Sequence, residues 1–184
     1  MRWCSSKRGC VRHIISVLVE NEFGVLARVA GLFSGRGFNI ESLCVAETLD
    51  PTVSAMTIAT TGSEAILEQI LKQLNKLINV IKVVDFQEVE HVTREMALVK
   101  IHATERSREE ILRMTEIFRG KVIDVSARTY TIEITGTEDK IKAFLTLVKP
   151  LGIKELVRTG PVAMIRGEKM IEVREKEPKG GSDG

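Results

Sequence analysis

One order of predicted elements occurs twice along the 184-residue chain, and no other feature of the sequence constrains the fold as strongly. In each half an apolar, β-rich segment is followed by an amphipathic helical segment, two further β-rich segments, a second helix and a final strand. The first set is expected at residues 13–20, 25–34, 39–49, 56–61, 63–77 and 79–89. The second set begins about 82 residues later, at residues 96–103, 107–118, 122–127, 130–135, 137–148 and 153–157.

This β-α-β-β-α-β order is that of a ferredoxin-like domain, so we predict an α+β protein made of two tandem ferredoxin-like domains. Right-handed crossovers place both helices of each half on one face of a four-stranded antiparallel sheet and leave the other face open. A domain of about 75 residues has a small core. We therefore expect the open face to pack against the sister half, a second copy of the chain or another protein.

Changes in composition along the chain suggest its division into parts. These are a polar leader at residues 1–12, a first domain at 13–89, a linker at 90–94, a second domain at 95–165 and a flexible tail at 166–184. The leader lacks the apolar segment of a secretory signal, and no apolar run reaches the roughly 18 residues that a membrane span needs. We expect a cytoplasmic protein without a membrane segment.

Charge and aromatic content argue against a nucleic-acid-binding protein. The 27 basic and 25 acidic residues are interspersed and leave a net charge of only +2. Trp3 and Tyr130 are the only Trp and Tyr, so a stacking surface for single-stranded nucleic acid is not expected. The three cysteines, Cys4, Cys10 and Cys44, cannot all pair within one chain, and we expect free thiols.

The residues from which catalytic and metal centres are built are few and scattered. His13, His91 and His102 are far apart in sequence, and none has the spacing of a metal site. The chain has no Cys-x-x-Cys pair, no Gly-x-Ser-x-Gly elbow and no glycine motif for phosphate after a strand. We expect no catalytic residue, no metal and no cofactor on this chain, and we keep an enzyme only as an alternative.

The junction between the first expected strand and the first expected helix is the place best suited to a small ligand. Asn21 ends the strand, and Gly24 precedes the helix that begins at Val25. Amides in the first turn of a helix lack internal partners and lie at the positive end of the helix dipole, so a carboxylate can bind there. Gly24 lets a ligand approach the backbone, and the Asn21 amide offers donors and an acceptor to an amino acid. Val25, Leu26 and Ile40 could line a small apolar pocket.

Plainer interpretations of the same residues stay open. Gly24 can serve only to make a turn, and Asn21 only to cap it. The segment from Arg36 to Ile40 is a second candidate, because Asn39 begins the next strand and can face either the junction or a partner chain. Its plainer interpretation is an ordinary turn from helix to strand.

Several stretches of the sequence closely resemble one protein family. Residues 20–43 (ENEFGVLARVAGLFSGRGFNIESL), with the later DPTVSAMTI, resemble the ACT domain of the small regulatory subunits of acetolactate synthase, also called acetohydroxyacid synthase. The stretches REMALVKI from Arg94, TEIFRGKVIDV from Thr115 and RTGPVAMIRG from Arg158 resemble the second domain of that family. The resemblance extends over residues 12–170.

The resemblance implies a regulatory subunit and not a catalyst. Members of the family bind a large subunit whose thiamine diphosphate, magnesium and FAD perform a reaction of branched-chain amino-acid synthesis. They raise the activity of that subunit and confer feedback inhibition by valine. Their ACT domains pair in a homodimer and hold valine at the interface. A freestanding ACT-domain sensor that controls another enzyme or a transcription factor is the alternative.

The resemblance also implies which residues would contact valine. The ligand-contacting positions of the family fall on Asn21, Gly24, Val25 and Leu26 of one chain and on Asn39 and Ile40 of its neighbour. All six residues are compatible with the family pattern. Phe23 departs from it, because a small residue often precedes this glycine, and the difference affects the local shape of the expected pocket.

Overall fold

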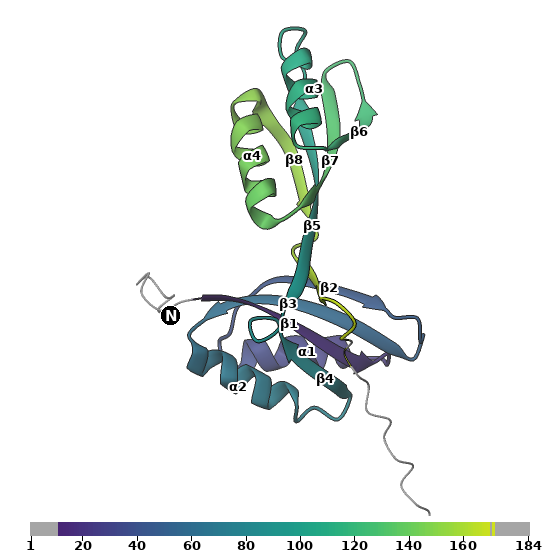
Figure 1. Cartoon of the computed structure of the whole chain (residues 1–184), viewed down its shortest axis with the longest axis vertical. Helices are drawn as coiled ribbons and strands as arrows, with labels where there is room; N and C mark the ends of the chain where they lie inside the picture. Colours follow the sequence, from purple (N-terminus) through teal and green to yellow (C-terminus); the bar gives the residue numbers. More distant parts are fainter. Residues whose placement is uncertain (1–10, 170, 172–184) are drawn as a thin grey trace, which may run out of the picture.

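The structure, a computed structural model, describes residues 11–169 and residue 171, which form two domains that follow one another along the chain (Figure 1). The elements of the first domain are β1 (Val11–Glu20), α1 (Val25–Gly35), β2 (Ile40–Glu47), β3 (Val53–Gly62), α2 (Glu64–Leu74) and β4 (Val80–Asp85). The four strands have the order β2-β3-β1-β4, and all neighbouring pairs are antiparallel. Both helices lie on the same face of this sheet (Figure 1).

The second domain repeats this arrangement. Its elements are β5 (His91–His102), α3 (Arg108–Ile117), β6 (Lys121–Val125), β7 (Thr129–Gly136), α4 (Glu138–Gly152), β8 (Ile153–Arg158) and a short β9 (Val162–Ile165). The sheet order β6-β7-β5-β8 corresponds strand by strand to the order in the first domain. The expected α+β fold with two βαββαβ domains is confirmed.

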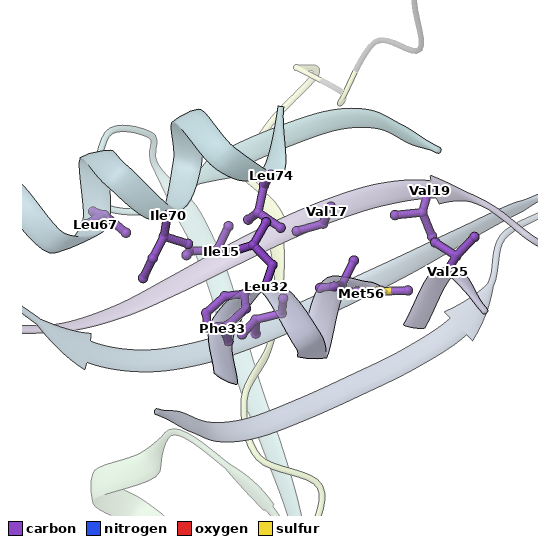
Figure 2. Close-up of a cluster of buried hydrophobic side chains, with 12 residues drawn as sticks. Ile15, Val17, Val19, Val25, Leu32, Phe33, Met56, Leu67, Ile70 and Leu74 are labelled. Carbon is purple, nitrogen blue, oxygen red and sulfur yellow. The ribbon is translucent and has the colours of Figure 1, made fainter. Parts of the chain in front are cut away.

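The first domain has its core between the sheet and the two helices (Figure 2). Ile15, Val17 and Val19 are alternate residues of β1, so their side chains point to the same face of the sheet, and all three are fully buried. They share one cluster with Val29 and Phe33, which lie one turn apart on α1. The apolar, β-rich run of β1 and the helical spacing in α1 are the signals from which the sequence predicted these two elements.

The second domain has a separate core. Val99 and Ile101 of β5 are buried with Ile111 of α3 and Phe144 of α4. The rings of Phe118 and Phe144 meet edge to face, with 5.5 Å between their centroids. Within the described part of the chain, no buried side chain belongs to both clusters. Each domain is therefore stabilised by its own apolar contacts.

Some expected boundaries differ from the structure. The segment expected as a linker, residues 90–94, has regular structure, because His91 begins β5 and the segment from His91 to Arg94 pairs with β9. The sequence analysis missed β9, whose four residues lie about 70 positions further on, and so missed the partner that makes this segment a strand. The strand expected to reach residue 89 ends at Asp85. The leader and the tail lie outside the described residues, except for Val11 and Arg12 in β1 and residues 166–169 and 171.

The second domain lies on the side of the first sheet that the helices leave open (Figure 1). At one point the two come into close contact, because Gly160, in the loop between β8 and β9, lies against the side chain of Ser42 in β2. The open face of the first sheet is thus in contact with the sister domain at this point, which is one of the three ways of covering it that were expected.

The separate cores lead to a test by core truncation. Phe33→Ala should destabilise the first domain, and Phe144→Ala the second, by about 3–5 kcal/mol each, through lost burial and the cavity left behind. Hydrogen exchange during denaturant titration should show reduced protection in the altered domain only. Leu49→Ala, at a fully exposed side chain, is the control and should change neither domain. Equal loss of protection in both domains would show a single cooperative unit and contradict the interpretation.

Candidate effector site

The loop between β1 and α1 has the backbone that a close approach of a ligand requires. Gly24 directly precedes α1 and has a φ of 81°, in the left-handed region that favours glycine. A Cβ built on Gly24 would meet no atom within 4 Å, so the space beside its backbone is open. The expected position of the glycine before the helix is thus found, together with free space next to it.

The first turn of α1 presents amides that the helix itself cannot satisfy. The N–H of Val25 donates to the Glu22 carbonyl at 3.4 Å, and the N–H of Arg28 donates to the Gly24 carbonyl at 3.0 Å. Among the described residues, the amides of Leu26 and Ala27 have no acceptor. These N–H groups lie at the positive end of the helix dipole and can bind a carboxylate.

The side chains at the start of α1 differ in what they can contribute. Val25 is only 3% exposed and belongs to the core of the first domain, so its side chain is not available to a ligand in this arrangement. Leu26 is 45% exposed and can offer apolar surface. Of the two expected pocket residues on the helix, Leu26 has the exposed side chain that this role requires, whereas Val25 has a buried side chain and an N–H that bonds the Glu22 carbonyl.

Asn21 is exposed and is held by the turn between β2 and β3. Its N–H donates to the Thr52 carbonyl at 2.7 Å, and its Nδ2 donates to the Pro51 carbonyl at 2.9 Å. Within the described part of the chain its Oδ1 has no donor, so it can accept from an ammonium group. The turn is itself ordered by Asp50, whose Oδ1 accepts from the hydroxyl and the N–H of Thr52. These two hydrogen bonds lower the pKa of Asp50.

A buried asparagine that the sequence analysis missed connects this loop to α1. Asn79 is 7% exposed, and its Nδ2 donates to Glu20 Oε2 at 2.8 Å and to Glu22 Oε2 at 3.0 Å. Its Oδ1 accepts from Arg28 Nη1, and its carbonyl accepts from the N–H of Glu20 at 2.9 Å. No motif marks this residue in the sequence, because its partners lie about 50 to 60 positions earlier.

Asn39 and Ile40 lie far from Asn21 and Gly24 within one chain. They follow the C-terminal end of α1, whose eleven residues are about 16 Å long. In the sheet, Glu20 pairs with Val53 at one end of β3, whereas Ile40 pairs with Thr60 near the other end. A single chain therefore does not bring the six expected contact residues together.

Among residues 11–169 and 171, no three or more His, Cys, Asp and Glu side chains are grouped so that they could hold a metal ion. None of the helices described combines the length and the apolar character that crossing a membrane requires.

The βαββαβ domain at the start of the chain is an ACT domain, because residues 15–82 match the family described as the AHAS small subunit-like ACT domain. Residues 94–167 match the family described as the small subunit of acetolactate synthase. The chain belongs to the acetolactate synthase small-subunit family, the regulatory and non-catalytic subunits of an enzyme of branched-chain amino-acid biosynthesis. Its partner is a large catalytic subunit, and this finding replaces the alternatives of a freestanding sensor and of an enzyme.

Similar proteins cover nearly the whole chain. The small subunit of acetolactate synthase from Aquifex aeolicus is 55% identical over 173 residues, which are 93% of this chain and 90% of that protein. The isozyme 3 small subunit from Escherichia coli is 52% identical over 162 residues, 88% of this chain and 99% of that protein. The crystal structure of the small subunit from Thermotoga maritima matches with a TM-score of 0.78 at 43% identity, over 86% of this chain and 99% of that one.

The hydrogen bonds of Asn79 suggest a test of what orders the loop. Asn79→Ala removes the partner of two carboxylates and one guanidinium, and should destabilise the first domain by about 1–3 kcal/mol. Hydrogen exchange of the amides at residues 20–28 should quicken by more than that of the sheet. Asn75→Ala is the control, because Asn75 is exposed and its side chain donates to the Leu71 carbonyl of its own helix. Unchanged exchange in the loop of the Asn79 variant would refute the role of this residue.

Proposed function

We propose that this chain activates the thiamine diphosphate-dependent large subunit of acetolactate synthase and confers feedback inhibition by valine, which binds between the first domains of two copies. The observation that carries the proposal is the junction at Gly24, where open space lies beside helix amides that have no acceptor in the described chain. The thiamine diphosphate, magnesium and FAD belong to the large subunit, and the complex works in the cytoplasm.

Each part of valine has a complementary group at this junction. The carboxylate binds the free amides of Leu26 and Ala27, where the helix dipole favours negative charge. The ammonium donates to Asn21 Oδ1, and the branched side chain packs on Leu26 and on Ile40 of the second copy. One methylene changes binding by only about 1–3 kcal/mol, so discrimination against leucine and isoleucine is modest.

The edge strand β2 offers the means of pairing two copies. It lies at one end of the strand order, and none of its outer backbone groups bonds another part of the described chain. An unpaired edge is a template for antiparallel pairing with the same strand of a second copy. In a two-fold pair the start of β2 lies beside the end of the partner strand, which is the sheet end that carries the loop from Asn21 to Gly24. Asn39 and Ile40 then approach the junction of the other copy.

A pocket shared by two chains explains how valine can regulate the enzyme. A ligand shifts a conformational equilibrium only if it interacts differently with the two states. Valine held between two protomers interacts differently with each arrangement of those protomers. A coupling of about 1–3 kcal/mol changes activity by roughly five- to 150-fold, which is sufficient for feedback control.

Gly24→Asp should abolish valine inhibition while leaving activation of the large subunit in place. The new carboxylate occupies the anion site and repels the ligand, and aspartate tolerates a positive φ better than most residues. The measurement is the activity of the complex reconstituted from both subunits, with and without valine. Gly31→Asp places the same charge at an exposed, uncrowded site further along α1 and should keep the inhibition. Normal valine inhibition of the Gly24 variant would refute the site.

Asn39→Ala should also weaken valine binding, and mixing it with Gly24→Asp tests whether the pocket is shared. In a mixed dimer one site carries both substitutions and the other carries neither. Random mixing makes half of the dimers mixed, so calorimetry should recover about a quarter of the wild-type sites. If Asn39 and Gly24 instead belonged to one pocket within each chain, mixing would restore no binding.

A further inference from the structure

The start of β2 carries contacts of two kinds. Asn39 and Ile40 are the residues that the proposed function assigns to valine in the neighbouring copy, so the inference below rests on that proposal. The next two residues, Glu41 and Ser42, contact the second domain or a residue that binds it. The pairing of β2 with β3 shifts register between Ile40 and Ser42, which marks a β-bulge at Glu41. Bulges turn a side chain away from the regular direction of the strand.

The first connection is a row of charges that crosses the domain junction. Arg12 of β1 pairs through Nε with Glu41 Oε2 at 2.9 Å, and through Nη1 with Glu138 Oε2. Glu138 is the first residue of α4 in the second domain, and its other oxygen pairs with Lys142 at 2.7 Å. Burial opposes ionisation of Glu138, but the hydrogen bond from Lys142 and the charge of Arg12 outweigh it and lower its pKa. All three side chains of this bridge are about one-third exposed.

The second connection is a steric contact one residue further along β2. Gly160 has a φ of 72°, and a Cβ at this position would lie 2.3 Å from the Cβ of Ser42. The loop that holds Gly160 is fixed to the second domain. The N–H of Thr159 donates to the Met96 carbonyl at 3.0 Å, and the Thr159 hydroxyl accepts from the N–H of Met96 at 3.1 Å.

Few other contacts in the described chain join the two domains, and one of them is between the rings of Phe86 and His91, whose centroids are 5.2 Å apart. The domains share no apolar core, and polar junctions of this kind allow relative motion. Open space lies on both sides of Arg12. One cleft, of about 680 Å³, is lined by Arg12 with residues from Phe86 to His91, and a smaller one, of about 60 Å³, by Arg12 with Glu138 and Pro161. A rotation at the junction therefore needs no repacking of either core.

We propose that Arg12 and Gly160 are positioning residues that connect the effector-binding start of β2 to the second domain, so that valine turns this domain relative to the first. Valine packed against Asn39 and Ile40 constrains the backbone at the bulge. The carboxylate of Glu41 and the side chain of Ser42 move with that backbone. Glu41 contacts Arg12, and Ser42 contacts Gly160. The regulatory signal thus leaves the effector pocket through β2 and reaches α4 through Arg12 and the β8–β9 loop through Gly160.

The first experiment measures domain orientation without valine. Spin labels at Gln69→Cys on α2 and Lys149→Cys on α4, with the three natural cysteines replaced by serine, report the distance between domains. Arg12→Gln should broaden the distance distribution, and Arg12→Lys, which keeps the charge, should restore part of the order. Lys72→Gln breaks an exposed pair with Glu68 within α2 and serves as the control without effect. An unchanged distribution in Arg12→Gln would overturn the bridge.

The second experiment separates transmission from binding. Arg12→Gln should bind valine in the full-length small subunit with an affinity within about threefold of wild type, whereas valine inhibition of the reconstituted complex should weaken about tenfold. Glu138→Gln should act in the same way. The double variant with Glu138→Gln and Arg12→Gln should lose little more inhibition than either single variant, because both substitutions break the same ion pair. An affinity loss equal to the loss of inhibition would place Arg12 in the binding site and overturn its role in transmission.

The steric contact can be tested independently. Gly160→Ala should displace the β8–β9 loop and shift the distance distribution, and Ser42→Gly in the same chain should reverse most of the shift by removing the clashing Cβ. No reversal would show that the effect arises only from strain at the positive φ and would overturn the contact.

Failure of the wild-type chain to bind valine would overturn the proposed function and the transmission with it. A wild-type chain that binds valine, with variants that behave as wild type, would overturn this inference alone.

Discussion

The constraint on which the proposed effector site depends is the turn at Gly24, where the chain must leave β1 and enter α1 with its first amides free. The positive φ of Gly24 makes this entry possible, and hydrogen bonds hold it from two sides. Asn21 is bound to the β2–β3 turn, and Asn79 joins the loop to Arg28 on the helix. Only a loop ordered in this way presents the same amides to every ligand molecule, since an unordered loop would lose entropy on binding.

Local patterns accounted for most of the fold. The apolar, β-rich run of β1, the helical spacing in α1 and the glycine before the helix each act over a few residues, and each was predictable from sequence. Three features were not predictable: the hydrogen bonds of Asn79, the pairing of His91–Arg94 with β9, and the ion pair between Arg12 and Glu138. All three join residues far apart in the chain, and a single sequence contains no signal for such pairs. Among the six expected effector residues, the buried side chain of Val25 shows the same limit, because burial depends on packing.

Family membership and the site rest on different kinds of observation. Similarity over nearly the whole length of both proteins establishes the family. The proposed effector site cannot be read from one chain in the same way, because α1 separates its two groups of residues by about 16 Å. This separation is itself an argument for a shared pocket. Two groups that cannot meet within a protomer can meet across a two-fold axis, where each copy supplies what the other lacks.

In a regulatory subunit, the binding of a small ligand must change the relative arrangement of whole domains. The two domains here have separate cores and a polar junction, so their relative orientation depends on few contacts. Two of these contacts begin at residues 41 and 42, directly after the pair assigned to valine. A weakly fixed junction whose contacts start at the proposed effector pocket can respond to a modest binding energy, whereas a shared apolar core would resist it. The lack of a common core is therefore what makes this fold suited to regulation.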